Sequence, residues 1–120
     1  MKYIDGFLIP VPKKKLDEYK KLARKAGKIW MEYGALDYVE CVADDVKKGK
    51  WTSFPQAVKQ KDGETVVFSY IIYKSRAHRD RVNKKVMADP RLMAMCDPGN
   101  MPFDGKRMMW GGFKSMVDMA

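Results

Sequence analysis

The sequence contains few of the residues that build disulfide scaffolds, metal centres and catalytic histidine pairs. Its 120 residues include two cysteines, Cys41 and Cys96, and one histidine, His78. These counts exclude a zinc site made of four cysteines, or of two cysteines and two histidines, and they exclude a disulfide-rich fold. Apolar residues never run for long enough to form a membrane-spanning helix. We therefore predict a protein with no metal, no cofactor and no membrane segment.

The first residues lack the pattern of a secretory signal peptide. Asp5 interrupts their apolar run, and Pro10 and Pro12 follow within a few positions. The two cysteines lie far apart, without a CxxC pair or a neighbouring histidine, which is typical of free thiols in a reducing compartment. We expect a cytoplasmic protein.

The chain carries an excess of positive charge. Lysine and arginine number 24 and aspartate and glutamate 15, which gives a net charge of +9. Many basic residues fall between positions 13 and 28, among them Lys20, Lys21 and Lys25. A basic helix face of this kind can attract RNA without sequence preference. No aromatic stacking motif of the RRM kind accompanies these lysines, so a solvated helix face is the favoured interpretation and RNA binding is the alternative.

The pattern of apolar residues predicts four strands and three helices. Within residues 13–33 the apolar positions recur three or four apart, and Gly34 follows as a helix-ending glycine. Ser75 is an expected N-cap, and Asp89-Pro90 has the pattern of an N-cap followed by proline at the first helical position. The expected strands are 3–11, 36–43, 66–73 and 108–117, and the expected helices are 13–33, 75–88 and 90–95.

These elements follow the order β-α-β-β-α-β. This is the split βαβ pattern of ferredoxin-like domains, an α+β class with a four-stranded antiparallel sheet and two helices on one face. It predicts a single domain over residues 1–120. Residues 44–51 are interpreted as a charged loop, and residues 54–60 are ambiguous because Pro55 weakens a strand assignment.

Both faces of the expected sheet are apolar. Successive side chains of a strand point to opposite faces. The third strand divides its side chains accordingly, with Val66, Phe68, Tyr70 and Ile72 on one side and Val67, Ser69, Ile71 and Tyr73 on the other. Two helices cover one face only, and a bare apolar face is larger than soluble monomers usually expose. We predict a homodimer in which two sheets pack face to face as an α+β barrel. The alternative is that residues 44–61 fold back over this face.

Several motifs occur together along nearly the whole chain. They are Lys2-Tyr3-Ile4-Asp5-Gly6-Phe7, Gly34-Ala35-Leu36 with Glu40-Cys41, Arg79-Asp80 with Asn83, Met87-Ala88-Asp89-Pro90-Arg91, Met101-Pro102-Phe103-Asp104-Gly105-Lys106-Arg107-Met108 and Gly111-Gly112-Phe113. On these residues the chain resembles the YbaA-like family, a bacterial family of unknown function in the dimeric α+β barrel superfamily. The resemblance implies the fold and the homodimer, and it brings no catalytic residues. Some members of that superfamily are cofactor-free monooxygenases, and others are haem-linked enzymes or small-molecule binders.

Acidic residues inside expected strands are the first candidates for chemistry. Asp5, Asp37 and Glu40 occupy such positions, where acids are depleted. In an apolar cleft the pKa of a carboxyl group rises, and the group can then act as a general acid or base. The structural alternative is a salt bridge. Available partners are Arg76, Arg79, Lys106 and Arg107.

His78 is the remaining catalytic candidate beside Asp5 and Glu40. Histidine titrates near neutral pH and can serve as a base. Three arginines nearby, Arg76, Arg79 and Arg81, would disfavour its protonation, so a surface or capping role is the favoured interpretation.

Aromatic residues of the third and fourth strands are candidate ligand contacts. Tyr70, Tyr73, Trp110 and Phe113 are expected near the cleft between the sheet and the helices, where they would line a pocket for a flat organic ligand. We add Arg107 as a further ligand-binding candidate. Packing in the core or across a dimer is the alternative for the aromatic residues.

Three functions are compatible with these features. The first is a homodimer that binds a small organic molecule, with a cofactor-free, monooxygenase-like enzyme as its extension by fold analogy alone. It requires an enclosed cleft lined by aromatic residues, methionines and at least one buried carboxylate. The second is an RNA-associated protein, and the third is a purely structural module. The connection 97–107 is either a lid over the cleft or a plain crossover.

Overall fold

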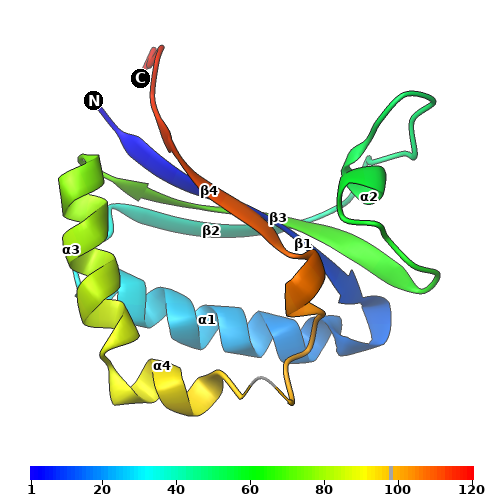
Figure 1. Ribbon diagram of the computed structural model, residues 1–120, viewed down its shortest axis with the longest axis horizontal. Coiled ribbons are helices and arrows are strands. Elements are labelled where there is room, and N and C mark those ends of the chain that lie inside the picture. Colours follow the sequence, from blue (N-terminus) through cyan, green and yellow to red (C-terminus); the bar gives the residue numbers. More distant parts are fainter. Residues whose placement is uncertain (98) are drawn as a thin grey trace.

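The computed structural model describes residues 1–97 and 99–120 of the chain (Figure 1). Four strands form one antiparallel sheet in the order β2-β3-β1-β4. They are β1 (Tyr3–Pro12), β2 (Asp37–Val42), β3 (Glu64–Tyr73) and β4 (Met109–Lys114). The helices are α1 (Leu16–Glu32), α2 (Phe54–Ala57), α3 (Arg76–Met87) and α4 (Pro90–Met95). The element order and the antiparallel sheet confirm the predicted ferredoxin-like α+β class.

Helix α1 packs on the sheet through one apolar side. The buried residues of this side are Tyr19, Ala23, Gly27 and Ile29. The helix begins later than expected, because Lys13–Lys15 form a 3-10 turn before it. Gly34 follows its end with φ of +110°, a conformation that favours glycine. Across residues 1–97 and 99–120, no helix is both long enough and apolar enough to cross a bilayer.

Side-chain caps fix the start of α3 and α4. The hydroxyl of Ser75 accepts a hydrogen bond from a backbone N–H in the first turn of α3. The carboxylate of Asp89 does the same for α4, in which Pro90 is the first helical residue. Both predicted N-caps are therefore confirmed.

Residues 54–60, which the sequence leaves ambiguous, contain the short helix α2. Ser53 caps this helix, and Pro55 lies in its first turn, where proline is tolerated. The helix stands on the face of the sheet opposite the other helices (Figure 1). There Val58 is buried, and the rings of Phe54 and Phe68 meet edge to face at 6.4 Å between centroids. Residues 44–61 thus fold back over one end of this face and leave the rest uncovered.

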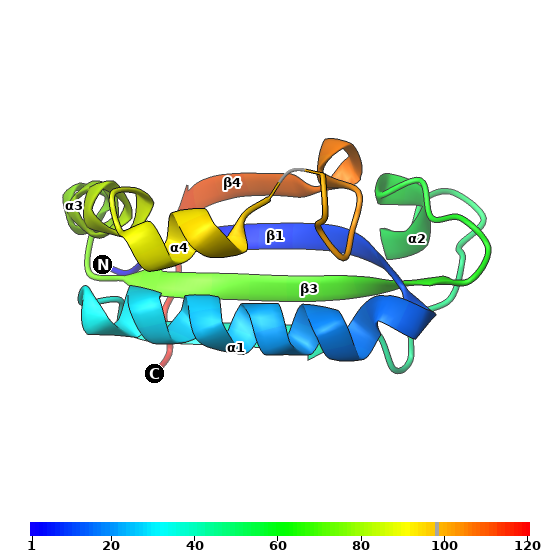
Figure 2. The same cartoon turned by 90° about the horizontal axis from the view of Figure 1, so that it is seen from below.

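Helices α1, α3 and α4 lie on the other face of the sheet (Figure 2). The core beneath them forms two clusters. One contains Ile29, Ala35, Ile71, Tyr73, Val82, Val86 and Leu92. The second contains Ile9, Val11, Tyr19, Ala23 and Val67. Phe7 packs against both clusters, so the middle of the sheet lies between them.

The face away from α1, α3 and α4 is apolar, and we call it the open face. The strand register and the alternation of side chains place on it Ile4, Leu8, Val39, Cys41, Phe68, Tyr70, Ile72, Met109 and Phe113. Phe68 is 46% exposed and Phe113 is 64% exposed. Two apolar faces of one sheet are therefore confirmed, and the homodimer inferred from them stays a prediction.

Candidate functional site

A cavity of about 410 Å³ lies between the helix-covered face of the sheet and helices α1, α3 and α4. Its apolar lining includes Phe7, Ile9, Leu22, Ala26, Ile71, Met87, Leu92, Met95 and Trp110, together with Met101, Phe103 and Met108 from the connection between α4 and β4. Its polar lining includes Asp5, Tyr19, Trp30, Tyr38, Glu40, Ser69, Tyr70 and Asn83. Apolar walls with a few polar groups are typical of small-molecule sites.

One row of residues across the sheet forms the floor of this cavity. The register pairs Trp110 with Phe7, Phe7 with Ser69, and Ser69 with Glu40. The rings of Phe7 and Trp110 are stacked at 6.4 Å between centroids. The floor therefore has an aromatic end on β4 and β1 and a polar end on β3 and β2. It lies between the two core clusters, against both of which Phe7 packs.

Asp5 provides a buried carboxylate beside this floor. The residue is 1% exposed, and its Oδ1 accepts a hydrogen bond of 2.9 Å from the guanidinium of Arg79. Arg79 also pairs with Asp80 and lies over the ring of Tyr3. Burial raises the pKa of Asp5, and the charge of Arg79 opposes this rise. Asp5 is thus a carboxyl group that can hold a proton more readily than one in water.

Asn83 joins the helices to the sheet at the wall of the cavity. Its side-chain oxygen accepts hydrogen bonds from Trp30 Nε1 at 3.0 Å and from the Tyr73 hydroxyl at 3.3 Å. One amide from α3 therefore links α1 and β3. Tyr73 is fully buried behind the lining, and burial raises the pKa of its hydroxyl.

Glu40 accepts two short hydrogen bonds at the opposite wall. The hydroxyl of Tyr19 donates to Oε1 at 2.6 Å, and that of Tyr38 donates to Oε2 at 2.7 Å. Burial, strengthened by the nearby carboxylate, raises the pKa of both phenols, so both remain donors at neutral pH. Gly27 lets α1 approach here, because a Cβ at this position would lie 2.8 Å from the ring of Tyr38.

The same residues separate the cavity from an outer groove. This groove, of about 1010 Å³, runs between α1 and β2 and is flanked by Lys20, Arg24 and Lys28. Tyr19, Ala23, Tyr38 and Glu40 line both spaces. The hydrogen-bonded group around Glu40 therefore forms the partition between the outer groove, whose lining carries both lysine or arginine and carboxylate side chains, and the inner cavity.

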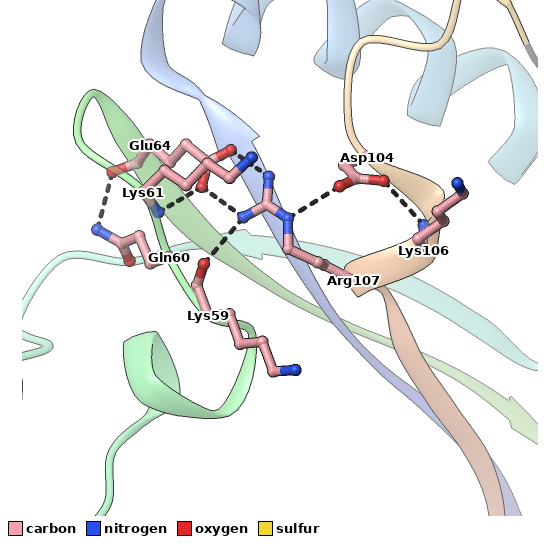
Figure 3. Close-up of polar contacts among 7 residues, drawn as sticks. All are labelled: Lys59, Gln60, Lys61, Glu64, Asp104, Lys106 and Arg107. Carbon is pink, nitrogen blue, oxygen red and sulfur yellow. Dashed lines mark hydrogen bonds and ion pairs between the residues drawn. The ribbon is translucent and has the colours of Figure 1, made fainter.

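Arg107 anchors the wall that carries Phe103 and Met108 (Figure 3). Its guanidinium binds both carboxylate oxygens of Glu64, at 2.8 and 2.7 Å. It also donates to Asp104 at 2.9 Å and to the carbonyl oxygen of Lys59 at 3.0 Å. These bonds join the connection before β4 to the start of β3, and they hold the pKa of Glu64 below its ordinary value.

The aromatic residues expected near the cleft occupy three different environments. Trp110 lines the cavity. Tyr73 lies behind its wall. Tyr70 and Phe113 project from the open face, where the ring of Tyr70 meets that of Phe68, so their rings lie away from the helices. Arg107 is bound by carboxylates outside the cavity lining. Of this predicted set, Trp110 and Tyr70 contribute to the cavity lining, and Tyr73, Phe113 and Arg107 do not.

The remaining predicted residues lie away from the cavity. His78 Nδ1 accepts a hydrogen bond from the backbone N–H of Lys74, and partial burial together with nearby positive charges lowers its pKa. Asp37 is exposed and accepts from the backbone N–H of the next residue. The three lysines proposed for RNA binding, Lys20, Lys21 and Lys25, are exposed on α1. Across the described parts of the chain, no cluster of three metal-ligating acids, histidines or cysteines is found.

Five polar lining residues were not predicted from the sequence: Tyr19, Trp30, Tyr38, Ser69 and Asn83. The alternation of strand side chains gives part of this information. It places Ser69 on the same side of its strand as Tyr73, and it places Tyr38 on the same side of its strand as Glu40. Which helix residues meet these strand residues depends on the packing of α1 and α3, which local periodicity does not determine.

Comparison with known proteins identifies the family. Residues 2–105 match the family described as "Protein of unknown function (DUF1428)". The chain belongs to the DUF1428 family. It is 51% identical over 118 residues to the "Uncharacterized protein YbaA" of Escherichia coli K12, covering 98% of this chain and 99% of that protein, and the YbaA of Shigella flexneri matches equally. The YbaA-like resemblance is therefore confirmed.

Among solved structures, the DUF1428 fold is similar to an uncharacterized NIPSNAP domain protein from Burkholderia xenovorans. The TM-score is 0.56, and the similarity covers 96% of this chain and 95% of that chain. Sequence identity is 14%, so the similarity supports the fold alone.

Replacing Arg107 should loosen the wall of the DUF1428 cavity. Arg107→Met leaves the buried Glu64 carboxylate without its cation, and loss of one partner of a buried pair costs about 3–5 kcal/mol of unfolding free energy. Urea denaturation measures this loss. Lys106→Met is the matched control, because Lys106 is exposed and adjacent. Equal losses in the two variants would show that the Glu64–Arg107 pair does not anchor this wall.

Removing Arg79 should make stability depend on pH in a defined direction. In Arg79→Met the effect of burial on Asp5 loses the charge that most strongly opposes it, so the pKa of its carboxyl rises further above the ordinary value of 3.8. The folded state then binds this proton more tightly than the unfolded state, and stability falls as pH rises through that window. Compared with the natural protein, the variant should be least destabilised in mild acid and most destabilised at neutral pH.

Thermal unfolding across this pH range measures the effect. Arg76→Met is the control, because Arg76 is exposed at the start of the same helix. The double variant Asp5→Asn with Arg79→Met should recover part of the stability at neutral pH, because no unpaired buried charge remains. A loss of stability in Arg79→Met that is the same at every pH would contradict the assignment of Arg79 as the group that opposes the rise in the pKa of Asp5.

Proposed function

We propose that this protein binds a small organic molecule in the cavity between its sheet and helices. The observation that carries the proposal is a cleft of about 410 Å³, partly open to solvent and within the range of small-molecule sites, whose mostly apolar walls include Trp110, four methionines and the carboxylate of Asp5. The small-molecule-binding hypothesis drawn from the sequence requires a cleft lined by aromatic residues, methionines and at least one buried carboxylate. Methionine side chains adapt to irregular ligands, which suits a wall of Met87, Met95, Met101 and Met108.

The two carboxylates of the lining are the groups available for proton transfer. Asp5 is buried with a raised pKa, and Glu40 is fixed by two phenols. A ligand in the cavity would lie within reach of both, which supports a cofactor-free acid–base reaction as the extension of the binding function. The free thiols of Cys41 and Cys96 suit the reducing cytoplasm in which we expect the protein to act.

We further propose that the working unit is a homodimer formed through the open face. Each copy presents the same apolar surface, and a two-fold axis pairs such a surface with itself. A standard interface of about 800 Å² per partner would shelter Phe68 and Phe113, which are exposed in the single chain. Helix α2 covers only one end of this face and leaves room for the second sheet.

Filling the cavity should abolish retention of the ligand. Ala26 lines the cavity from α1, and Ala26→Phe would occupy part of its volume. Ala94→Phe is the matched control, because Ala94 is exposed on α4 and lies outside the lining. Mass spectrometry of gently purified protein measures the bound compound.

We expect an organic molecule to be retained by the natural protein and by Ala94→Phe, and lost from Ala26→Phe. Thermal unfolding confirms that both variants fold. Equal retention by Ala26→Phe, or natural protein that carries no compound and takes up no aromatic probe, would reject the cavity as a binding site.

A further inference from the structure

The polar end of the cavity floor carries the hydroxyl group of Ser69. Ser69 is 5% exposed and lines the cavity. Within residues 1–97 and 99–120 the one fully buried side-chain oxygen or nitrogen without a partner is Ser115 Oγ, so the hydroxyl of Ser69 is not a buried orphan and is open to the cavity. Ser69 faces Glu40 across the β3–β2 pairing. A hydroxyl group that can donate and accept hydrogen bonds therefore lies next to a carboxylate, at the surface of a space large enough for a ligand.

Glu40 retains the capacity to accept another hydrogen bond. Each carboxylate oxygen accepts two, and each oxygen of Glu40 receives one, from Tyr19 and Tyr38 respectively. The two phenols also fix the carboxylate in place by bonds from two different elements, α1 and β2. Glu40 and Ser69 together can accept one hydrogen bond from a hydroxyl group and donate one to it.

The other end of the floor is an aromatic surface. Phe7 and Trp110 lie side by side with an angle of 22° between their rings. Three inter-strand steps of about 4.8 Å each separate Trp110 from Glu40 along the floor. This distance accommodates a flat ring system against the aromatic end, with a polar substituent at Ser69 and Glu40.

The charges of the lining exclude an acidic ligand. Asp5 and Glu40 are the ionisable carboxylates of the lining, and among its described residues no lysine, arginine or histidine occurs. The nearest cation to Asp5, Arg79, is already bound to Asp5 and Asp80. A ligand carboxylate at the polar end would be buried beside Glu40 without a counter-charge, which is unfavourable. A neutral hydroxyl meets no such penalty.

We propose that the cavity binds a neutral, flat aromatic molecule that bears a hydroxyl group, with its ring against Phe7 and Trp110 and its hydroxyl between Ser69 and Glu40. This proposal rests on the binding function proposed above and adds the class of ligand. The ligand hydroxyl donates to the Glu40 carboxylate and accepts from the Ser69 hydroxyl.

Calorimetric titration of the full chain with three naphthalenes tests the ligand class. The probes are 2-naphthol, 2-methoxynaphthalene, which lacks the donor, and 2-naphthoate, which carries a negative charge at neutral pH. We expect 2-naphthol to bind about tenfold to a hundredfold more tightly than 2-methoxynaphthalene, because a lost donor leaves buried acceptors unpaired. The 2-naphthoate ion should bind most weakly.

Two variants test whether Ser69 and Glu40 recognise the hydroxyl group of 2-naphthol, and a third variant serves as a control. Ser69→Ala and Glu40→Gln should each reduce the preference for 2-naphthol over 2-methoxynaphthalene. Asp37→Asn, an acid-to-amide change on the same strand at an exposed site outside the lining, should leave the preference unchanged. Thermal unfolding confirms that each variant folds before titration.

The outcomes separate this inference from the binding function itself. Binding of 2-naphthoate as tightly as 2-naphthol, or a preference unchanged in both Ser69→Ala and Glu40→Gln, would overturn the ligand class while leaving a binding cavity in place. Failure of all three probes to bind would reject the binding function, and the ligand class with it.

Discussion

The sheet has two apolar faces, but the layer of α1, α3 and α4 covers only one of them. Strand β1 lies in the middle of the sheet, and its side chains alternate between a face that meets α1, α3 and α4 and a face that meets only α2. Burial of apolar surface contributes about 25 cal/mol per Å², so the uncovered face is a substantial source of association free energy. The fold is therefore complete on one side and lacks a partner on the other.

The helix layer itself leaves the middle of its own face unfilled. One core cluster joins α3, α4 and the end of α1 to β3, and the second joins the start of α1 to β1. Between them the floor has an aromatic end, Phe7 and Trp110, and a polar end, Ser69 and Glu40, and polar contacts hold parts of the walls in place. Arg79 holds Asp5, two phenols hold Glu40, and Arg107 anchors the connection before β4. Hydrogen-bonded groups from β1, β2, α1 and α3 and from the connection before β4 therefore hold the walls of the cavity.

Local patterns in the sequence predict most of the fold. Helix α1 follows from its apolar spacing, the caps of α3 and α4 from Ser75 and Asp89, and the two sheet faces from alternation. In each of two pairs of residues predicted to line one ligand site, the two members cannot both do so through their side chains. Tyr70 and Tyr73 differ by an odd number of positions along one strand, as do Trp110 and Phe113, so the members of each pair had to face opposite ways.

Contacts between distant residues were not predictable in this way. Arg79 was one of four possible partners for Asp5, and its place on α3 above β1 selects it. Arg107 was predicted to contact a ligand, but the 3-10 turn at Gly105–Arg107 directs its side chain to Glu64. Tyr19 appeared as a core residue of α1, and the angle of the helix over β2 brings its hydroxyl to Glu40. Such pairings depend on tertiary packing, which propensity does not encode.

The reactivity of the two cysteines tests most directly whether the open face is covered in solution. Cys41 projects from this face in the row of Phe68, Leu8 and Met109, whereas Cys96 ends α4 on the other side of the sheet. Both thiols are exposed in the single chain. Maleimide labelling over a dilution series, with peptide mass spectrometry, should show Cys41 protected relative to Cys96 in concentrated protein and deprotected on dilution. Equal rates for Cys41 and Cys96 at every concentration would contradict the pairing of two sheets.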